Sequence, residues 1–131
     1  SNVMAYVTIA STGNATDFGD LLETTYGLAG CSSSTRGLFS GGQASSGASN
    51  VIQYITIAST GNATDFGDLT VTDGGPAATS SQTKALIGGF TTGNTAVDVV
   101  TISSTGNATD YGDLTVGKGD LDATSNAHGG L

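Results

Sequence analysis

The sequence has few or none of several residue types that usually form the core of a small fold or cross-link it. Its 131 residues include no tryptophan and only one each of cysteine, proline, methionine and histidine. Aromatic residues make up 6% of the chain, so a core must be built mainly from Ile, Val, Leu and Ala. A single cysteine excludes an intrachain disulfide, and Cys31 is predicted to be a small buried apolar residue.

Positive charge is also scarce. Three basic residues stand against eleven acidic ones, which gives a formal net charge of −8. This negative charge would repel the phosphate groups of a nucleic acid, so no nucleic-acid partner is expected. No apolar run approaches the roughly 18 to 20 residues of a membrane span, and no basic-then-apolar signal segment opens the chain.

The residues of an active site are missing as well. His128 is the only imidazole, so neither a histidine metal site nor a catalytic triad can be assembled around a second one. No Gly-x-Ser-x-Gly elbow is present, and Gly74-Gly75-Pro76 lacks the lysine of a phosphate loop. The sequence therefore predicts no enzyme, no catalytic residue and no cofactor.

Glycine, by contrast, is abundant, and one phrase occurs three times. Residues Tyr6–Leu21 return as Tyr54–Leu69 with a single change and again as Val99–Leu114 with conservative changes. The copies begin 48 and 45 residues apart. Each is followed by a small-residue segment and then by paired glycines, namely Gly41-Gly42, Gly88-Gly89 and Gly129-Gly130. The sequence thus predicts a single repeat domain, 1–131, with units at approximately 1–42, 43–89 and 90–131.

Each unit is predicted to be all-β, with helices nearly absent. In the second unit the expected strands are Val51–Ile57, a segment centred on Phe66, Ala77–Ser81 and Lys84–Ile87. Ser59-Thr60-Gly61-Asn62 is interpreted as a turn, because Gly and Asn tolerate positive φ, and Gly67-Asp68 is interpreted as the stop of a strand. Four short strands in about 45 to 48 residues fit a β-propeller blade, with the glycine pair ending its innermost strand. A β-helix with shorter coils is the alternative.

The same landmarks resemble the kelch repeat. Leu38-Phe39-Ser40-Gly41-Gly42 matches its strand closed by two glycines, Tyr54 its tyrosine strand, and Phe66 stands where kelch usually has tryptophan. The repeated phrase is also similar to Gly/Ser-rich kelch-like repeat proteins of marine bacteriophages and environmental aquatic sequences. That resemblance implies a virion or appendage protein; it supplies no ligand.

Three blades leave a propeller ring incomplete, since four to eight are usual. The chain opens at Ser1-Asn2-Val3, which matches Ser49-Asn50-Val51, and it closes just past Gly129-Gly130. Each end then resembles half of a broken blade. Three interpretations remain open: a fragment of a six- or seven-bladed protein, a protomer completed by a neighbouring copy, or an isolated monomer of three blades.

Two site types recur with the repeat. Asp-aromatic-Gly-Asp offers weak calcium candidates, which are Asp17, Asp20, Asp65, Asp68, Asp110 and Asp113. Asn-Ala-Thr matches the N-glycosylation pattern at Asn14, Asn62 and Asn107, each expected in an exposed loop. Ordinary turn chemistry is the alternative explanation for both.

The function predicted from these features is a structural repeat protein of a virion or extracellular fibre that self-associates through its terminal strands. The alternative is an adhesion or glycan-binding propeller, whose variable loops Gly42–Ser49 and Thr91–Asn94 would contact a cell-surface ligand. Either role predicts an extracellular or virion-surface location.

Overall fold

The computed structural model describes residues 1–72, 74–91 and 93–126. Within these residues there is no helix, and hence none that could cross a membrane. The strands, in chain order, are β1 Val3–Tyr6, β2 Thr16–Asp20, β3 Thr25–Tyr26, β4 Ala29–Ser32, β5 Arg36–Ser40, β6 Gln43–Ala44, β7 Gly47–Ala48, β8 Val51–Thr56, β9 Thr64–Asp68, β10 Ala77–Ser80, β11 Lys84–Gly88, β12 Ala96–Thr101 and β13 Thr109–Asp113. The predicted all-β class is confirmed.

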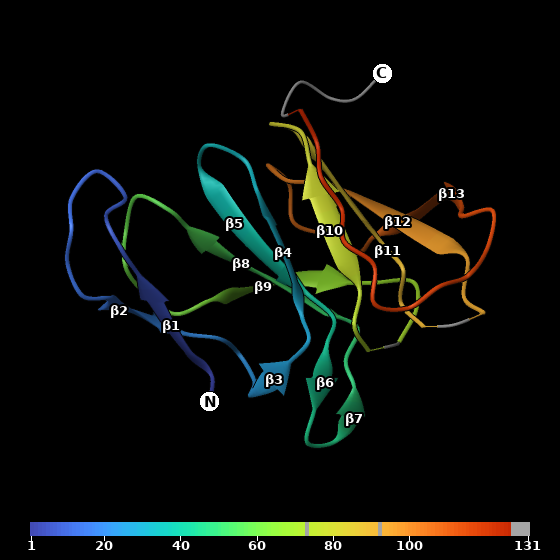
Figure 1. Ribbon diagram of the computed structural model, residues 1–131, viewed down its shortest axis with the longest axis horizontal. Coiled ribbons are helices and arrows are strands. Elements are labelled where there is room, and N and C mark those ends of the chain that lie inside the picture. Colours follow the sequence, from blue (N-terminus) through green and yellow to red (C-terminus); the bar gives the residue numbers. More distant parts are fainter. Residues whose placement is uncertain (73, 92, 127–131) are drawn as a thin grey trace.

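The described strands form four small antiparallel sheets (Figure 1). Two are complete four-stranded sheets, ordered β4-β5-β8-β9 and β10-β11-β12-β13. A two-stranded sheet, β1-β2, flanks the first of these, and a small sheet of β3, β6 and β7 lies below it in the view of Figure 1. The strands predicted in the second unit are all present.

The repeated phrase has the same strand register in all three copies. Val3 pairs with Asp20, Val51 with Asp68, and the third pair is Ala96 with Asp113. Each pair of strands also carries a register shift at the equivalent place, after Met4, Ile52 and Val97. Equal sequence has thus produced equal pairing and an equal bulge, in sheets with different numbers of strands.

The glycine pairs end a different strand from the one expected. Gly41-Gly42 follow β5, which is the second strand of its sheet, because β4 pairs with β5 and forms the edge. Gly41 has a φ of +63°, and a Cβ there would lie 2.9 Å from the Pro76 ring. The pair is therefore needed where the linker to the next sheet crosses the strand end. Gly129 and Gly130 lie outside the described residues.

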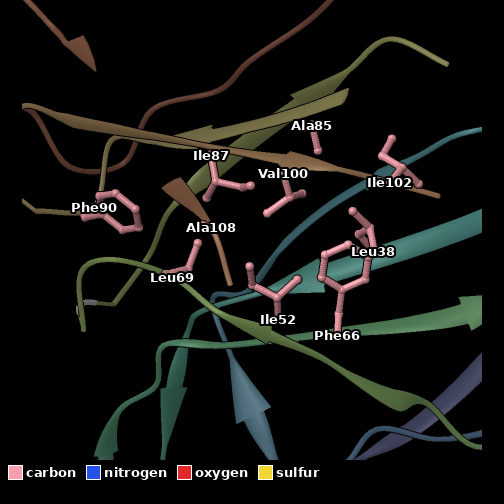
Figure 2. Packing of buried hydrophobic residues seen from close by; sticks show 10 residues of the cluster. All are labelled: Leu38, Ile52, Phe66, Leu69, Ala85, Ile87, Phe90, Val100, Ile102 and Ala108. Carbon is pink, nitrogen blue, oxygen red and sulfur yellow. The ribbon is translucent and has the colours of Figure 1, made fainter. Parts of the chain in front are cut away.

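The main core lies between the two complete sheets (Figure 2). Leu38, Ile52 and Phe66 come from the first sheet and face Ala85, Ile87 and Val100 of the second, with Leu69, Phe90, Ile102 and Ala108 completing the cluster. A smaller cluster of Met4, Phe18 and Ala63 joins the two-stranded sheet to the first complete sheet. The two complete sheets and the two-stranded sheet therefore each bury apolar residues against a neighbouring sheet.

Phe66 and Tyr111 hold the same position in their repeats, but their exposed fractions are 2% and 64%. We therefore expect Phe66→Ala to lower the free energy of unfolding by about 3 to 5 kcal/mol, the usual cost of truncating a buried ring. Tyr111→Ala is the matched control and should change it by less than about 0.5 kcal/mol. Urea denaturation in dilute solution measures both, and equal losses would contradict this account of the core.

Candidate assembly surface

Neighbouring sheets are joined by main-chain hydrogen bonds that repeat with the sequence. We call Phe18-Gly19-Asp20 and its equivalents, 66–68 and 111–113, the outer triplets, because each lies on the last strand of its sheet. We call Gly61-Asn62-Ala63 and its equivalents, 13–15 and 106–108, the docking triplets. A joint is the contact between an outer triplet and the docking triplet of the next repeat.

In the first joint the docking triplet lies along β2. The Gly61 N–H donates to the Phe18 carbonyl at 2.7 Å, and the Ala63 N–H donates to the Asp20 carbonyl at 2.8 Å. In return the Asp20 N–H donates to Asn62 Oδ1 at 3.0 Å. Three bonds therefore tie one sheet to the next through backbone and one amide side chain.

The second joint repeats the first bond for bond. The Gly106 N–H donates to the Phe66 carbonyl at 2.7 Å, the Ala108 N–H to the Asp68 carbonyl at 2.8 Å, and the Asp68 N–H to Asn107 Oδ1 at 3.0 Å. Each such bond contributes roughly 1 kcal/mol of net stabilisation. Its donors and acceptors alternate at fixed positions, which sets the register between sheets.

The glycine of each outer triplet is required by this close approach. A Cβ on Gly19 would lie 2.3 Å from the Gly61 carbonyl oxygen, and one on Gly67 would lie 2.4 Å from that of Gly106. No side chain fits at that distance, and φ values of +143° and +146° also disfavour one. The glycine interpreted from sequence as a strand stop instead lies inside β2 and β9.

The turn predicted at 59–62 is only partly correct, because the observed turn ends at Ser59 and does not include Gly61-Asn62. The turn lies earlier, where the Ser59 N–H donates to the Thr56 carbonyl at 3.2 Å. Gly61, with a φ of +159°, is close to extended, and the docking triplet runs straight along the neighbouring strand. Asn62 and Asn107 are exposed, as predicted, and their Oδ1 atoms belong to the joints.

Each joint also has a buried polar acceptor that the sequence reasoning did not single out. Gln53 Oε1 accepts from the Leu22 N–H at 2.7 Å, and Asp98 accepts from the N–H and hydroxyl of Thr70 at 2.7 and 2.5 Å. Gln53 and Asp98 are 2% and 0% exposed. The signal was a polar residue inside an apolar strand, because such a residue must find a partner when buried.

Two long side chains reinforce the second joint. The Arg36 guanidinium on β5 donates to the Ile102 carbonyl at 2.9 Å and lies 4.5 Å from the centre of the Tyr54 ring. Tyr54 in turn meets Phe66 edge to face, with ring centres 6.0 Å apart. The cation is held over an aromatic face while it bridges the two sheets.

Other predicted site residues are placed without forming a site. Within the described ranges no group of three or more His, Cys, Asp or Glu side chains could hold a metal ion. Asp17 and Asp110 instead accept from the N–H groups of Gly19 and Gly112 at 3.1 Å. His128 lies outside the described residues, and Asn14 is exposed.

Cys31 is half-buried and packs against the main core rather than within it. Burial raises the pKa of its thiol from 9.0 to about 11, against a smaller opposing effect of a hydrogen bond with Ser80. The thiol is therefore protonated and poorly nucleophilic near neutral pH.

The third outer triplet and the first docking triplet have no counterpart within the described structure. β13 is the edge strand of its sheet, and residues 13–15 are exposed. A cleft of about 540 Å³ adjoins β13 and is lined by residues of 79–86, by 124–126 and by Tyr111. Two of its lining residues, Tyr111 and Leu86, stand at the positions of Phe66 and Leu38 in the core. Residues on this face are therefore the equivalents of residues that are buried in a completed joint.

No protein-family model matches the chain, and no curated protein matches it either.

A matched pair of glycine substitutions isolates the close approach in a joint. Gly67→Ala places a methyl group against the Gly106 carbonyl, whereas a Cβ on Gly112, with a similar φ of +149°, meets nothing within 4 Å. We expect Gly67→Ala to reduce the free energy of unfolding by at least about 2 kcal/mol more than Gly112→Ala, since backbone strain is common to both. Chemical denaturation in dilute solution, where no second copy covers Gly112, provides the comparison. Equal losses would mean that the positive φ, and not the close approach, accounts for the whole cost.

Proposed function

We propose that the chain is a structural repeat protein of a virion or extracellular appendage, built from kelch-like propeller blades and assembling by self-association. In this proposal each complete four-stranded sheet is one blade and β1-β2 is the outer half of another. The role is architectural and non-enzymatic. Its place is the virion surface or the outside of a cell.

One observation carries the proposal: the same joint occurs twice within the chain, while a third outer triplet and a further docking triplet lie open. A strand edge with unpaired N–H and C=O groups is a template for another chain. Edge-to-edge pairing of this kind is a recurrent mode of protein association. The molecule therefore carries both halves of a contact that it already makes internally.

The surface composition supports an architectural role. Only 11% of residues are charged, and the docking triplets consist of Gly, Asn and Ala. Burying such residues at an interface avoids the desolvation cost of charged side chains. The scarcity of charge therefore favours extended packing of like units over recognition of a charged partner.

A second candidate function is adhesion to a glycan. β6 and β7 form a hairpin that projects from the body of the structure, with Ser45 and Ser46 exposed at its tip (Figure 1). Hydroxyl-rich loops on a rigid scaffold suit contact with sugar hydroxyls. The other loop predicted to bind, 91–94, includes a position outside the described residues.

Self-association predicts species larger than one chain. Sedimentation velocity and negative-stain microscopy over a rising concentration series should reveal them at physiological salt, where the repulsion from a net charge of −8 is screened beyond about 8 Å. A particle that stays monomeric up to the millimolar range would contradict the structural proposal.

The adhesion candidate predicts binding to a glycan array that is lost when residues 43–46 are replaced by glycine and alanine. Replacing exposed Ser103 and Ser104, far along the chain from the hairpin, is the control and should leave binding unchanged. Absence of any glycan signal from a folded, assembling protein would remove this candidate and leave the structural one.

A further inference from the structure

We infer that two copies of the chain bind head to tail, with the docking triplet of one copy, residues 13–15, lying along the outer triplet of the other, residues 111–113. This inference rests on the proposed function and deepens it, because it names the surface through which the copies associate. The occupant of the open face is a second copy of this chain.

The backbone groups are complementary. By equivalence with the two internal joints, the Gly13 N–H donates to the Tyr111 carbonyl of the other copy and the Ala15 N–H donates to the Asp113 carbonyl. The Asp113 N–H donates to Asn14 Oδ1. These are the same three bonds, at the same positions of the repeat, that the chain forms at Phe18–Asp20 and Phe66–Asp68.

The side chains that this contact would cover are exposed here and buried at the equivalent positions. Tyr111 is 64% exposed, whereas Phe18 and Phe66 are 9% and 2% exposed. Val7 is 55% exposed, whereas Ile55 is half-buried and Val100 is 4% exposed. Ala15 is exposed, while Ala63 and Ala108 are buried at 5% and 8%.

Lys84 extends the equivalence to the far end of the joint. It pairs with Thr101 as Arg36 pairs with Thr56, and its side chain is exposed. Arg36 bridges to the Ile102 carbonyl of the next sheet. The equivalent acceptor in the first copy of the phrase is the carbonyl of Ile9, whose side chain is 98% exposed.

The two faces differ, so the contact is heterologous. Each copy that binds through one face leaves its other face open, and association therefore continues until a ring closes or a filament forms. A symmetric dimer would use one face twice and would not satisfy the alternating donors and acceptors.

One contact of the internal joints is missing from this one. Ala5 stands where Gln53 and Asp98 supply the buried acceptor, and Thr115 stands where Leu22 and Thr70 donate to it. The contact between copies is therefore weaker than the internal joints. Ala5→Gln restores the acceptor and should tighten association about five-fold, the effect of one net hydrogen bond.

The test uses one blocking substitution on each face of the full chain. Ala15→Arg places a long cation where the equivalent alanines are buried, and Tyr111→Lys places a charge where the equivalent rings are buried; both sites are exposed in the free chain. Each variant alone should associate at least about thirty-fold more weakly in analytical ultracentrifugation. Their equimolar mixture should form a 1:1 heterodimer, because each retains the face that the other has lost.

The controls are Ser11→Arg and Thr109→Lys. Their equivalents, Ser59 and Ser104 in one case and Thr16 and Thr64 in the other, stay exposed beside completed joints. Both controls should associate as the unchanged chain does. Circular dichroism of all four variants confirms the β-sheet content, and heterodimer formation itself requires that both blocked variants are folded.

The outcomes separate the two proposals. If the unchanged chain assembles but the blocked variants assemble equally well, or their mixture stays monomeric, this contact is wrong while self-association stands. If the unchanged chain and the Ala5→Gln variant are both monomeric at every concentration, the contact and the structural role fall together.

Discussion

The structure depends on the joint between an outer triplet and the docking triplet of the next repeat. Neither complete sheet has a second layer of its own, so its apolar face is hidden only when the neighbouring sheet is held at the correct distance and register. Three hydrogen bonds fix that register, and the glycine opposite them sets the distance. The core of Leu38, Ile52 and Phe66 against Val100 follows from that placement.

Main-chain hydrogen bonds join the sheets and side chains form the core, and these separate contributions explain the composition. A core of aliphatic residues with few rings contributes modest burial, and a chain rich in glycine loses much conformational entropy on folding. Repeated backbone pairing between sheets supplies contacts that need no large side chain. Arg36 and the buried acceptors Gln53 and Asp98 then add polar bonds across the joints.

The sequence predicted the main strands of the second unit, but it missed the short strands β6 and β7, which fall in the predicted loop 42–49, and it did not predict the joints. β-branched and aromatic residues in partial alternation located β8, and the threefold phrase predicted repeating units, because strand propensity is a local property. Gly61-Asn62 was interpreted as a turn and Gly67-Asp68 as a strand stop, because those residues favour turns in isolation. Their actual role depends on a strand some forty residues away, as in the bond from Asp20 to Asn62, which no local pattern encodes. The buried acceptors were missed for the same reason.

The equal register of the three copies bears on how such a gene changes in length. Since each internal joint uses the same positions of the phrase, a recombination event that duplicates or deletes one repeat leaves the three hydrogen bonds between outer and docking triplets the same in every remaining joint. The protein can therefore be lengthened or shortened by a single genetic step, without compensating substitutions. Selection can then act on the tip of the β6-β7 hairpin, while the joints between units stay constant.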